Sequence, residues 1–211
     1  MRNPTQQTKF EKWPHTGAVF CNVINSRITR NTSVHDVKKL ELTCQMLSQV
    51  CSQVVLIGNY DFLPESLLHL KYVSTNLINK GPIGCLEALL SSGIDTEYIL
   101  TPCDVGIQNI EIFKLLTDCH IKPPAILTYP YLPAKATPQF PPSIDLIDQP
   151  LISKYSVKSL PKIREQIIKN DLSMHRLAQL GEATRVVVPR ELIYNEGPDS
   201  PIPTEKIYHL N

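Results

Sequence analysis

The chain has 211 residues, of which 42% are hydrophobic, and its formal net charge is +1. This size and composition suit one α/β domain that spans residues 1–211. The near-neutral charge gives no electrostatic case for a nucleic-acid partner or an anionic membrane, and no apolar stretch approaches the roughly 18 residues that span a bilayer.

The chain begins with a polar stretch, residues 1–15, which we expect to be a frayed leader. Because this stretch has no apolar region, we expect no secretory signal. Short apolar runs then predict strands over residues 18–24, 54–57, 72–74, 98–100, 125–129 and 185–188. Apolar residues at helical spacing predict helices over residues 40–50, 65–70, 84–92, 110–116, 160–169 and 174–180. This alternation predicts a three-layer α/β/α fold with a mainly parallel sheet.

Proline is concentrated in residues 122–142, around the expected strand at 125–129. Because proline donates no amide hydrogen bond, we expect an irregular, extended surface segment. A proline-rich ligand for a partner protein is the alternative interpretation of this segment.

The six cysteines are scattered through apolar contexts without a CxxC pair. This distribution predicts reduced thiols in the core and a cytoplasmic protein. Cys103 is the one cysteine to weigh as a nucleophile, although no histidine has a clear relation to it.

The most informative stretch runs from Gly81 to Asp104 and reads as a glycine turn, a helix, a buried strand and an acid at the strand end. Ligands of open α/β sheets sit beyond the carboxyl ends of the strands, so Asp104 occupies a position typical of functional residues. Its carboxylate is a natural Mg²⁺ ligand. The alternative is that Asp104 caps the helix expected at 110–116.

The sequence GPIGCLEAL, followed by a strand and PCD, resembles the GPLAG…PCD region of the molybdenum cofactor guanylyltransferases. The resemblance implies a nucleotide-diphospho-sugar-transferase-like (Rossmann-like) fold, with GTP and molybdopterin as substrates and Mg²⁺ as cofactor. It implies that Asp104 binds the metal, and that Gly81, Pro82 and Gly84 line the nucleotide site.

The family's signature loop, LAGGxSxRMG, aligns with residues 20–29 and is degenerate here. In this register Asn25 and Arg27 are implied to contact the nucleotide, with Arg27 also catalytic. Asn22 and Val23 replace the two loop glycines, and Asn22 is kept as a nucleotide-binding candidate because Asn tolerates left-handed backbone angles.

The family's essential lysine falls on Thr32 in this chain, and Arg30 or Lys38 are the candidates to replace it. A second acid expected before the GPLAG motif is also missing, with Asn76 and Asn79 as the nearest polar residues. Two classes of function therefore stay open. One is an active but diverged nucleotidyltransferase, and the other is a non-catalytic relative that binds a nucleotide or a partner protein.

The later part of the chain carries further similarity. The run DQPLISKY is similar to the short QPL motif of the family's pterin-binding half, which implies that Gln149 contacts the pterin. Asn195 falls where the family has an Asn-rich turn and is a second pterin-binding candidate. The resemblance also implies molybdoenzymes or other proteins of cofactor biosynthesis as partners.

Overall fold

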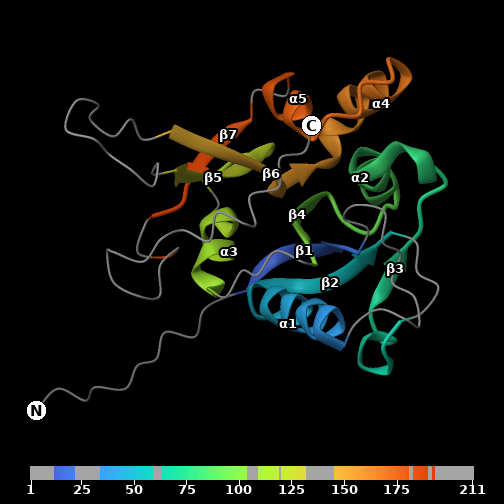
Figure 1. Cartoon of the computed structure of the whole chain (residues 1–211), viewed down its shortest axis with the longest axis vertical. Coiled ribbons are helices and arrows are strands. Elements are labelled where there is room, and N and C mark those ends of the chain that lie inside the picture. Colours follow the sequence, from blue (N-terminus) through green and yellow to red (C-terminus); the bar gives the residue numbers. More distant parts are fainter. Residues whose placement is uncertain are drawn as a thin grey trace, which may run out of the picture.

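The computed structural model describes residues 12–21, 34–58, 63–103, 109–118, 120–131, 145–180, 183–189 and 192. A central sheet runs through the molecule with helices on both of its faces (Figure 1). The strands are β1 (Trp13–Phe20), β2 (Cys51–Ile57), β3 (Lys71–Val73), β4 (Glu97–Pro102), β5 (Ala125–Tyr131), β6 (Asp145–Ser156) and β7 (Thr184–Val187). The α-helices are α1 (Val34–Val50), α2 (Gly81–Ser91), α3 (Ile110–Thr117), α4 (Leu160–Ile168) and α5 (Met174–Leu180). Three short 3₁₀ helices are η1 (Glu65–Leu67), η2 (Ile78–Lys80) and η3 (Val157–Ser159).

The sheet has seven strands in the order β3-β2-β1-β4-β6-β5-β7. The pairs β2–β3, β1–β2, β1–β4 and β5–β7 are parallel, whereas β6 is antiparallel to both β4 and β5. The predicted three-layer α/β/α fold with a mainly parallel sheet is therefore confirmed.

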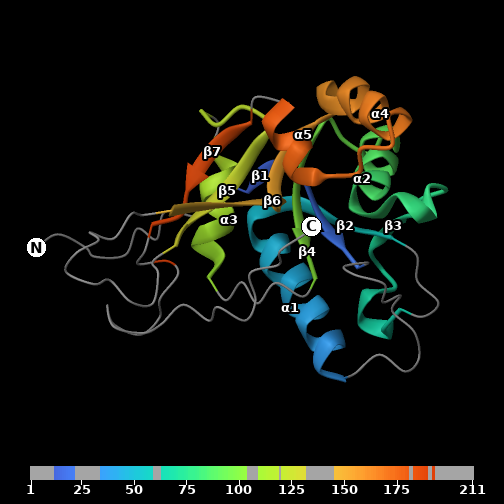
Figure 2. The ribbon, with the colours of Figure 1, turned by 45° about the horizontal axis from the view of Figure 1, so that its top comes forward.

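The two faces of the sheet bury separate apolar clusters, because successive side chains of a strand point to opposite faces. Val19 packs with residues of α1 and α3 on one face, and Ala18 and Phe20 pack with residues of α2, α4 and α5 on the other. Figure 2 shows the same division of the helices. None of the described helices combines the length and the apolar character that crossing a bilayer requires.

The first strand begins earlier than the sequence predicted. We expected a strand at residues 18–24 and a leader through residue 15, but β1 starts at Trp13 and ends at Phe20. Trp13 is buried, and Lys154 lies over its ring with 5.0 Å between Nζ and the ring centroid. This contact and strand pairing, rather than a continuous apolar run, order residues 13–15. Residues 22–24 lie outside the described residues.

The sequence did not predict β6 as a strand, although it lies between β4 and β5. Proline is unusual in a central strand because it has no N–H to donate. In this strand Pro150 falls at an irregularity: Ile126 pairs with Ser153, whereas the next residue, Leu127, pairs with Gln149. The hydroxyl of Ser153 donates to the Pro150 carbonyl at 2.9 Å, so the bulged turn has its own hydrogen bond.

Other boundaries differ in smaller ways from the prediction. Helix α1 begins at Val34, six residues before the helix predicted at 40–50. The helix predicted at 65–70 is the short 3₁₀ helix η1. Strand β5 lies in the proline-rich segment where we expected a strand, and residues 132–142 lie outside the described residues.

The first turn of α2 packs closely against the segment that precedes it. A Cβ added at Gly84 would lie 2.8 Å from the carbonyl oxygen of Leu77, which is backbone and cannot rotate away. The Thr75 hydroxyl donates to the Gly84 carbonyl at 3.2 Å and accepts from the Leu77 N–H at 3.0 Å. Gly84 is thus the residue that permits α2 to approach residues 75–77.

We predict that Gly84→Ala lowers the free energy of unfolding by about 1–3 kcal/mol, because the added methyl forces the 75–77 backbone away from α2. Urea unfolding measures this loss. Gln45→Ala is the control, since it places the same side chain at an exposed position of a helix, α1, and should change stability by no more than about 0.5 kcal/mol. Equal stability of Gly84→Ala and the wild type would contradict the packing role.

Candidate functional site

The carboxyl ends of the parallel strands form a continuous row. Cys21, just after β1, donates its N–H to the Ile57 carbonyl at 3.0 Å, and Cys103, just after β4, donates to the Phe20 carbonyl at 2.9 Å. Gly58 likewise donates to Val73 at 3.2 Å. We call this row, with the residues that follow it, the carboxyl edge.

The strand order reverses at this edge. From β1 the chain builds outward through β2 to β3, and it then crosses to the other side of β1 to form β4. Ligands of open α/β sheets bind in the crevice outside such a switch point. The strands that lead to Cys21 and to Asp104 are neighbours at this point, because Phe20 pairs with Pro102.

The glycine turn lies at the carboxyl edge, because α2 follows β3 and leads back to the start of β4. Gly81 has a φ of +58° and a ψ of −149°, a conformation that only glycine adopts readily. Gly81 is exposed and Pro82 half-buried, whereas Gly84 is buried against the Leu77 segment. Gly81 and Pro82 therefore offer surface at this edge, and the packing of α2 accounts for Gly84.

Gln149 also lies toward the carboxyl edge. Leu100 pairs with Ser153 in the antiparallel β4–β6 ladder, so residues that precede Ser153 extend toward the carboxyl end of β4. Gln149 itself pairs with Leu127 and is half-buried. The fold thus brings Gln149 toward the same edge of the sheet, the carboxyl edge, as the glycine turn, which lies far earlier in the chain.

Several expected site residues lie outside the described residues, namely Asn22, Val23, Asn25, Arg27, Arg30, Thr32, Asp104 and Asn195. The roles that the resemblance implies for these residues therefore stay predictions. Lys38, Asn76 and Asn79 are described, and all three are exposed.

Most of the described cysteines are buried free thiols. Cys21, Cys44, Cys51, Cys85 and Cys103 are free cysteines, and Cys103 is half-buried whereas the other four are buried. Burial raises the pKa of the Cys44 thiol to about 12, and the neighbouring Cys103 adds to the shift. The prediction of reduced core cysteines is confirmed for the four buried ones.

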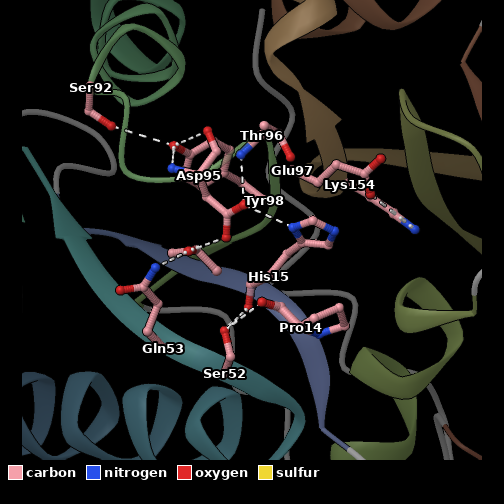
Figure 3. Close-up of polar contacts among 11 residues, drawn as sticks. Pro14, His15, Ser52, Gln53, Ser92, Asp95, Thr96, Glu97, Tyr98 and Lys154 are labelled. Atoms are coloured by element: carbon pink, nitrogen blue, oxygen red, sulfur yellow. Dashed lines mark hydrogen bonds and ion pairs between the residues drawn. The ribbon is translucent and has the colours of Figure 1, made fainter.

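The densest polar network among the described residues lies at the opposite, amino edge of the sheet (Figure 3). Asp95, in the turn between α2 and β4, has one carboxylate oxygen 2.8 Å from His15 Nδ1 and accepts the Thr16 hydroxyl on the other at 2.7 Å. Gln53 of β2 donates to the Thr16 hydroxyl at 2.8 Å. These contacts tie β1, β2 and the turn before β4 together.

The backbone groups of Asp95 add further hydrogen bonds to this polar network. The Tyr98 hydroxyl accepts from the Asp95 N–H at 2.7 Å and donates to the Asp95 carbonyl at 2.9 Å. Ser52 donates to the carbonyls of Pro14 and His15 (Figure 3). The ring of His15 is also in edge contact with Trp13, with 4.9 Å between the ring centroids. The network could not be found from the sequence, because His15 and Asp95 lie 80 residues apart and no local pattern joins them.

No protein-family model and no curated protein matches this sequence. Solved structures do match. A protein from Aquifex aeolicus is 19% identical with a TM-score of 0.67, covering 87% of this chain and 94% of that chain. Molybdopterin-guanine dinucleotide biosynthesis protein A from Archaeoglobus fulgidus is 13% identical with a TM-score of 0.54 over 84% of both chains. The 2-C-methyl-D-erythritol 4-phosphate cytidylyltransferase from Thermus thermophilus is 10% identical with a TM-score of 0.58, covering 86% of this chain and 93% of that chain.

These similarities establish the class of fold. The chain has the mostly parallel, seven-stranded mixed sheet of the nucleotidyltransferase-like fold, with helices on both faces. The molybdenum cofactor guanylyltransferases that the sequence resembles share this fold with cytidylyltransferases, so the fold alone does not choose the substrate.

The contribution of the polar network at the amino edge to the stability of the fold depends on pH, because Asp95 is ionisable. Partial burial pushes the pKa of Asp95 up, but hydrogen bonds from His15, Thr16 and the Thr96 N–H outweigh it and leave the pKa below its ordinary value. A carboxyl group with a lowered native pKa stabilises the fold above its ordinary pKa of about 3.9, and this contribution is lost as the pH falls through the native pKa.

We predict that Asp95→Asn lowers the free energy of unfolding by about 1–3 kcal/mol near neutral pH, because the charged acceptor of several hydrogen bonds is removed. The difference from the wild type should shrink when urea unfolding is repeated below about pH 4. Glu65→Gln, which neutralises an acid at an exposed position, is the control and should show neither effect. A pH-independent difference for Asp95→Asn would contradict the electrostatic origin.

Proposed function

We propose that this protein is a Mg²⁺-dependent nucleotidyltransferase that transfers GMP from GTP to molybdopterin and releases pyrophosphate. The pairing of β1 with β4 carries the proposal, because the stretches that begin at Asn22 and Asp104 follow adjacent strand ends at the switch point. The resemblance of the GPIG and PCD motifs and the similarity of fold to molybdopterin-guanine dinucleotide biosynthesis protein A support the choice of substrates.

In this reaction a phosphate oxygen of molybdopterin attacks the α-phosphorus of GTP. The bond from that phosphorus to the oxygen that bridges to the β-phosphate breaks, and pyrophosphate leaves with this oxygen. Arg27 would stabilise the charge that develops on the leaving group, because preorganised cations at such a position lower the barrier. Asn22 and Asn25 would contact the phosphates from the same loop.

Asp104 is the residue that would hold Mg²⁺. The ion is commonly bound by one or two carboxylates together with substrate phosphates, so a single acid directly after Cys103 fits this mode of binding. The described residues contain no group of three or more His, Cys, Asp or Glu side chains that could form an all-protein site. When bound, the ion neutralises charge on the phosphate oxygens.

Gly81, Pro82 and Gly84 would position the nucleotide at the start of α2, with Gly81 and Pro82 offering surface and Gly84 setting the packing of the helix. Gln149, on β6 toward the carboxyl edge, would hydrogen-bond the pterin together with Asn195. These substrates favour a cytoplasmic location, with molybdoenzymes or other proteins of cofactor biosynthesis as partners.

A second candidate function is a non-catalytic relative that binds a nucleotide or a partner protein. The observation that favours it is the composition of the loop after β1, where Val23 stands in place of a glycine and Thr32 in place of a lysine. A β-branched residue resists the backbone angles with which glycines wrap a phosphate.

We predict that the purified protein, given molybdopterin, GTP and Mg²⁺, forms the guanine dinucleotide cofactor and releases pyrophosphate. Arg27→Ala and Asp104→Asn should each lower the rate by about 10²–10³, because each removes a charge that stabilises the phosphates. Pyrophosphate release measures the rate, and chromatography of the dinucleotide confirms the product.

Glu165→Gln is the control, because Glu165 is an exposed acid on α4 and its loss should leave the rate unchanged. Lys38→Ala and Arg30→Ala then decide which cation replaces the missing lysine. A folded wild-type protein that turns over none of GTP, CTP and ATP would overturn the proposed reaction in favour of the non-catalytic candidate.

A further inference from the structure

Two cysteines stand side by side where β1 and β4 end. Phe20 pairs with Pro102 in the parallel β1–β4 ladder, and the Cys103 N–H extends this register with a hydrogen bond of 2.9 Å to the Phe20 carbonyl. The next position along the ladder therefore places Cys21 beside Cys103. Neighbouring strands lie about 4.8 Å apart. The Cα atoms of a disulfide lie about 4.4–6.8 Å apart, so the backbone holds these two cysteines within bridging distance.

Both side chains lie on the same face of the sheet. Cys21 is part of the apolar cluster that also contains Val19 and residues of α1 and α3, and Cys103 packs against this cluster. The Cys21 thiol donates to the Val19 carbonyl at 3.7 Å, a weak hydrogen bond that rotation about the Cα–Cβ bond releases. Two thiols on one face at adjacent strand ends can thus approach each other without a change of fold.

The two cysteines differ in exposure. Cys103 is half-buried and Cys21 is 2% exposed, and both carry thiols rather than a disulfide. A thiol reagent therefore reaches Cys103 first, and Cys21 is placed to react with the product. Redox-active sites often combine an accessible thiol with a second, resolving cysteine beside it. Cys44 of α1 belongs to the same cluster, but burial holds its pKa at about 12, so almost no thiolate forms there.

We propose that Cys103 and Cys21 form a redox-active dithiol, which closes to a disulfide across the ends of β1 and β4. The Cys103 thiolate attacks one sulfur of a small-molecule disulfide, whose S–S bond breaks, and the first thiolate leaves and takes up a proton. The Cys21 thiolate then attacks the Cys103 sulfur of the mixed disulfide and releases the second thiol in the same way. The two protein thiols lose two electrons, and the small-molecule disulfide gains them.

The disulfide regulates the proposed nucleotide site, a consequence that rests on the proposed function. Bridged Cβ atoms lie about 3.8 Å apart, closer than two paired strands, so the bond draws the strand ends together. Asn22 and Asp104 follow directly after the two cysteines. A displacement of about 1 Å lowers the rate at a catalytic site by about 10²-fold, so oxidation switches the site off. Strained disulfides are readily reduced, so the switch is reversible.

Peptide mass spectrometry of the folded protein, incubated with oxidised glutathione and then alkylated, tests the bond. We expect a pair of peptides linked through Cys21 and Cys103 that separates after treatment with dithiothreitol. Cys103→Ala should abolish this linked pair. Cys85→Ala is the control, because it removes a buried thiol from the opposite face of the sheet and should leave the linked pair unchanged. A bond from Cys103 to any other cysteine, or glutathione left on Cys103 with Cys21 still a thiol, would overturn the dithiol.

Calorimetric titration with GTP and Mg²⁺ tests the regulation. The oxidised wild type should bind at least about tenfold more weakly than the reduced protein, because the strand ends have moved, whereas the oxidant should leave the affinity of Cys103→Ala unchanged. A linked pair that forms without a change in GTP affinity would overturn the regulation. A reduced protein that binds no GTP would overturn the proposed function and this regulation together, while the dithiol itself is decided by the linked peptides.

Discussion

The parallel pairing of β1 with β4 is the constraint on which the rest of the molecule depends. It runs from Thr16 opposite Tyr98 to Phe20 opposite Pro102, and the Cys103 N–H extends it by one hydrogen bond. At the carboxyl edge this pairing creates the switch point where ligands of such sheets bind. At the amino edge this pairing brings the turn before β4 next to β1, where Asp95 accepts a hydrogen bond from Thr16. Gln53 of β2 donates to the same Thr16 hydroxyl, so β2 is joined to the network.

The two halves of the sheet show how much of the fold follows from sequence pattern. β2 and β4 are short apolar runs buried on both faces, and such runs are the strongest strand signal that a parallel sheet gives. β6 carries Pro150, and β4 ends at Pro102, which has no N–H to extend the ladder toward β6. The irregularity after Ile126 accommodates the proline, and no sequence pattern announces such a bulge. β6 is therefore a strand because it pairs with β4 and β5, and its own sequence pattern does not indicate one.

The candidate site was predictable to the extent that strand ends and glycine turns mark it. The GPIG turn and the end of β4 were located from sequence, and the structure places both at the carboxyl edge. The packing role of Gly84 was not predictable, because it depends on the Leu77 carbonyl approaching from the preceding segment.

Paramagnetic broadening by Mn²⁺ tests the central claim, that a nucleotide–metal complex binds at the carboxyl edge of the β1–β4 switch point. Isotope-labelled protein is titrated with Mn²⁺ in the presence of GTP, and amide signals are followed at both edges of the sheet. The account predicts that the amides of Cys21, Gly58 and Cys103 broaden while those of Ser52 and Asp95 stay sharp. Broadening confined to Ser52 and Asp95, or no selective broadening with GTP present, would contradict it.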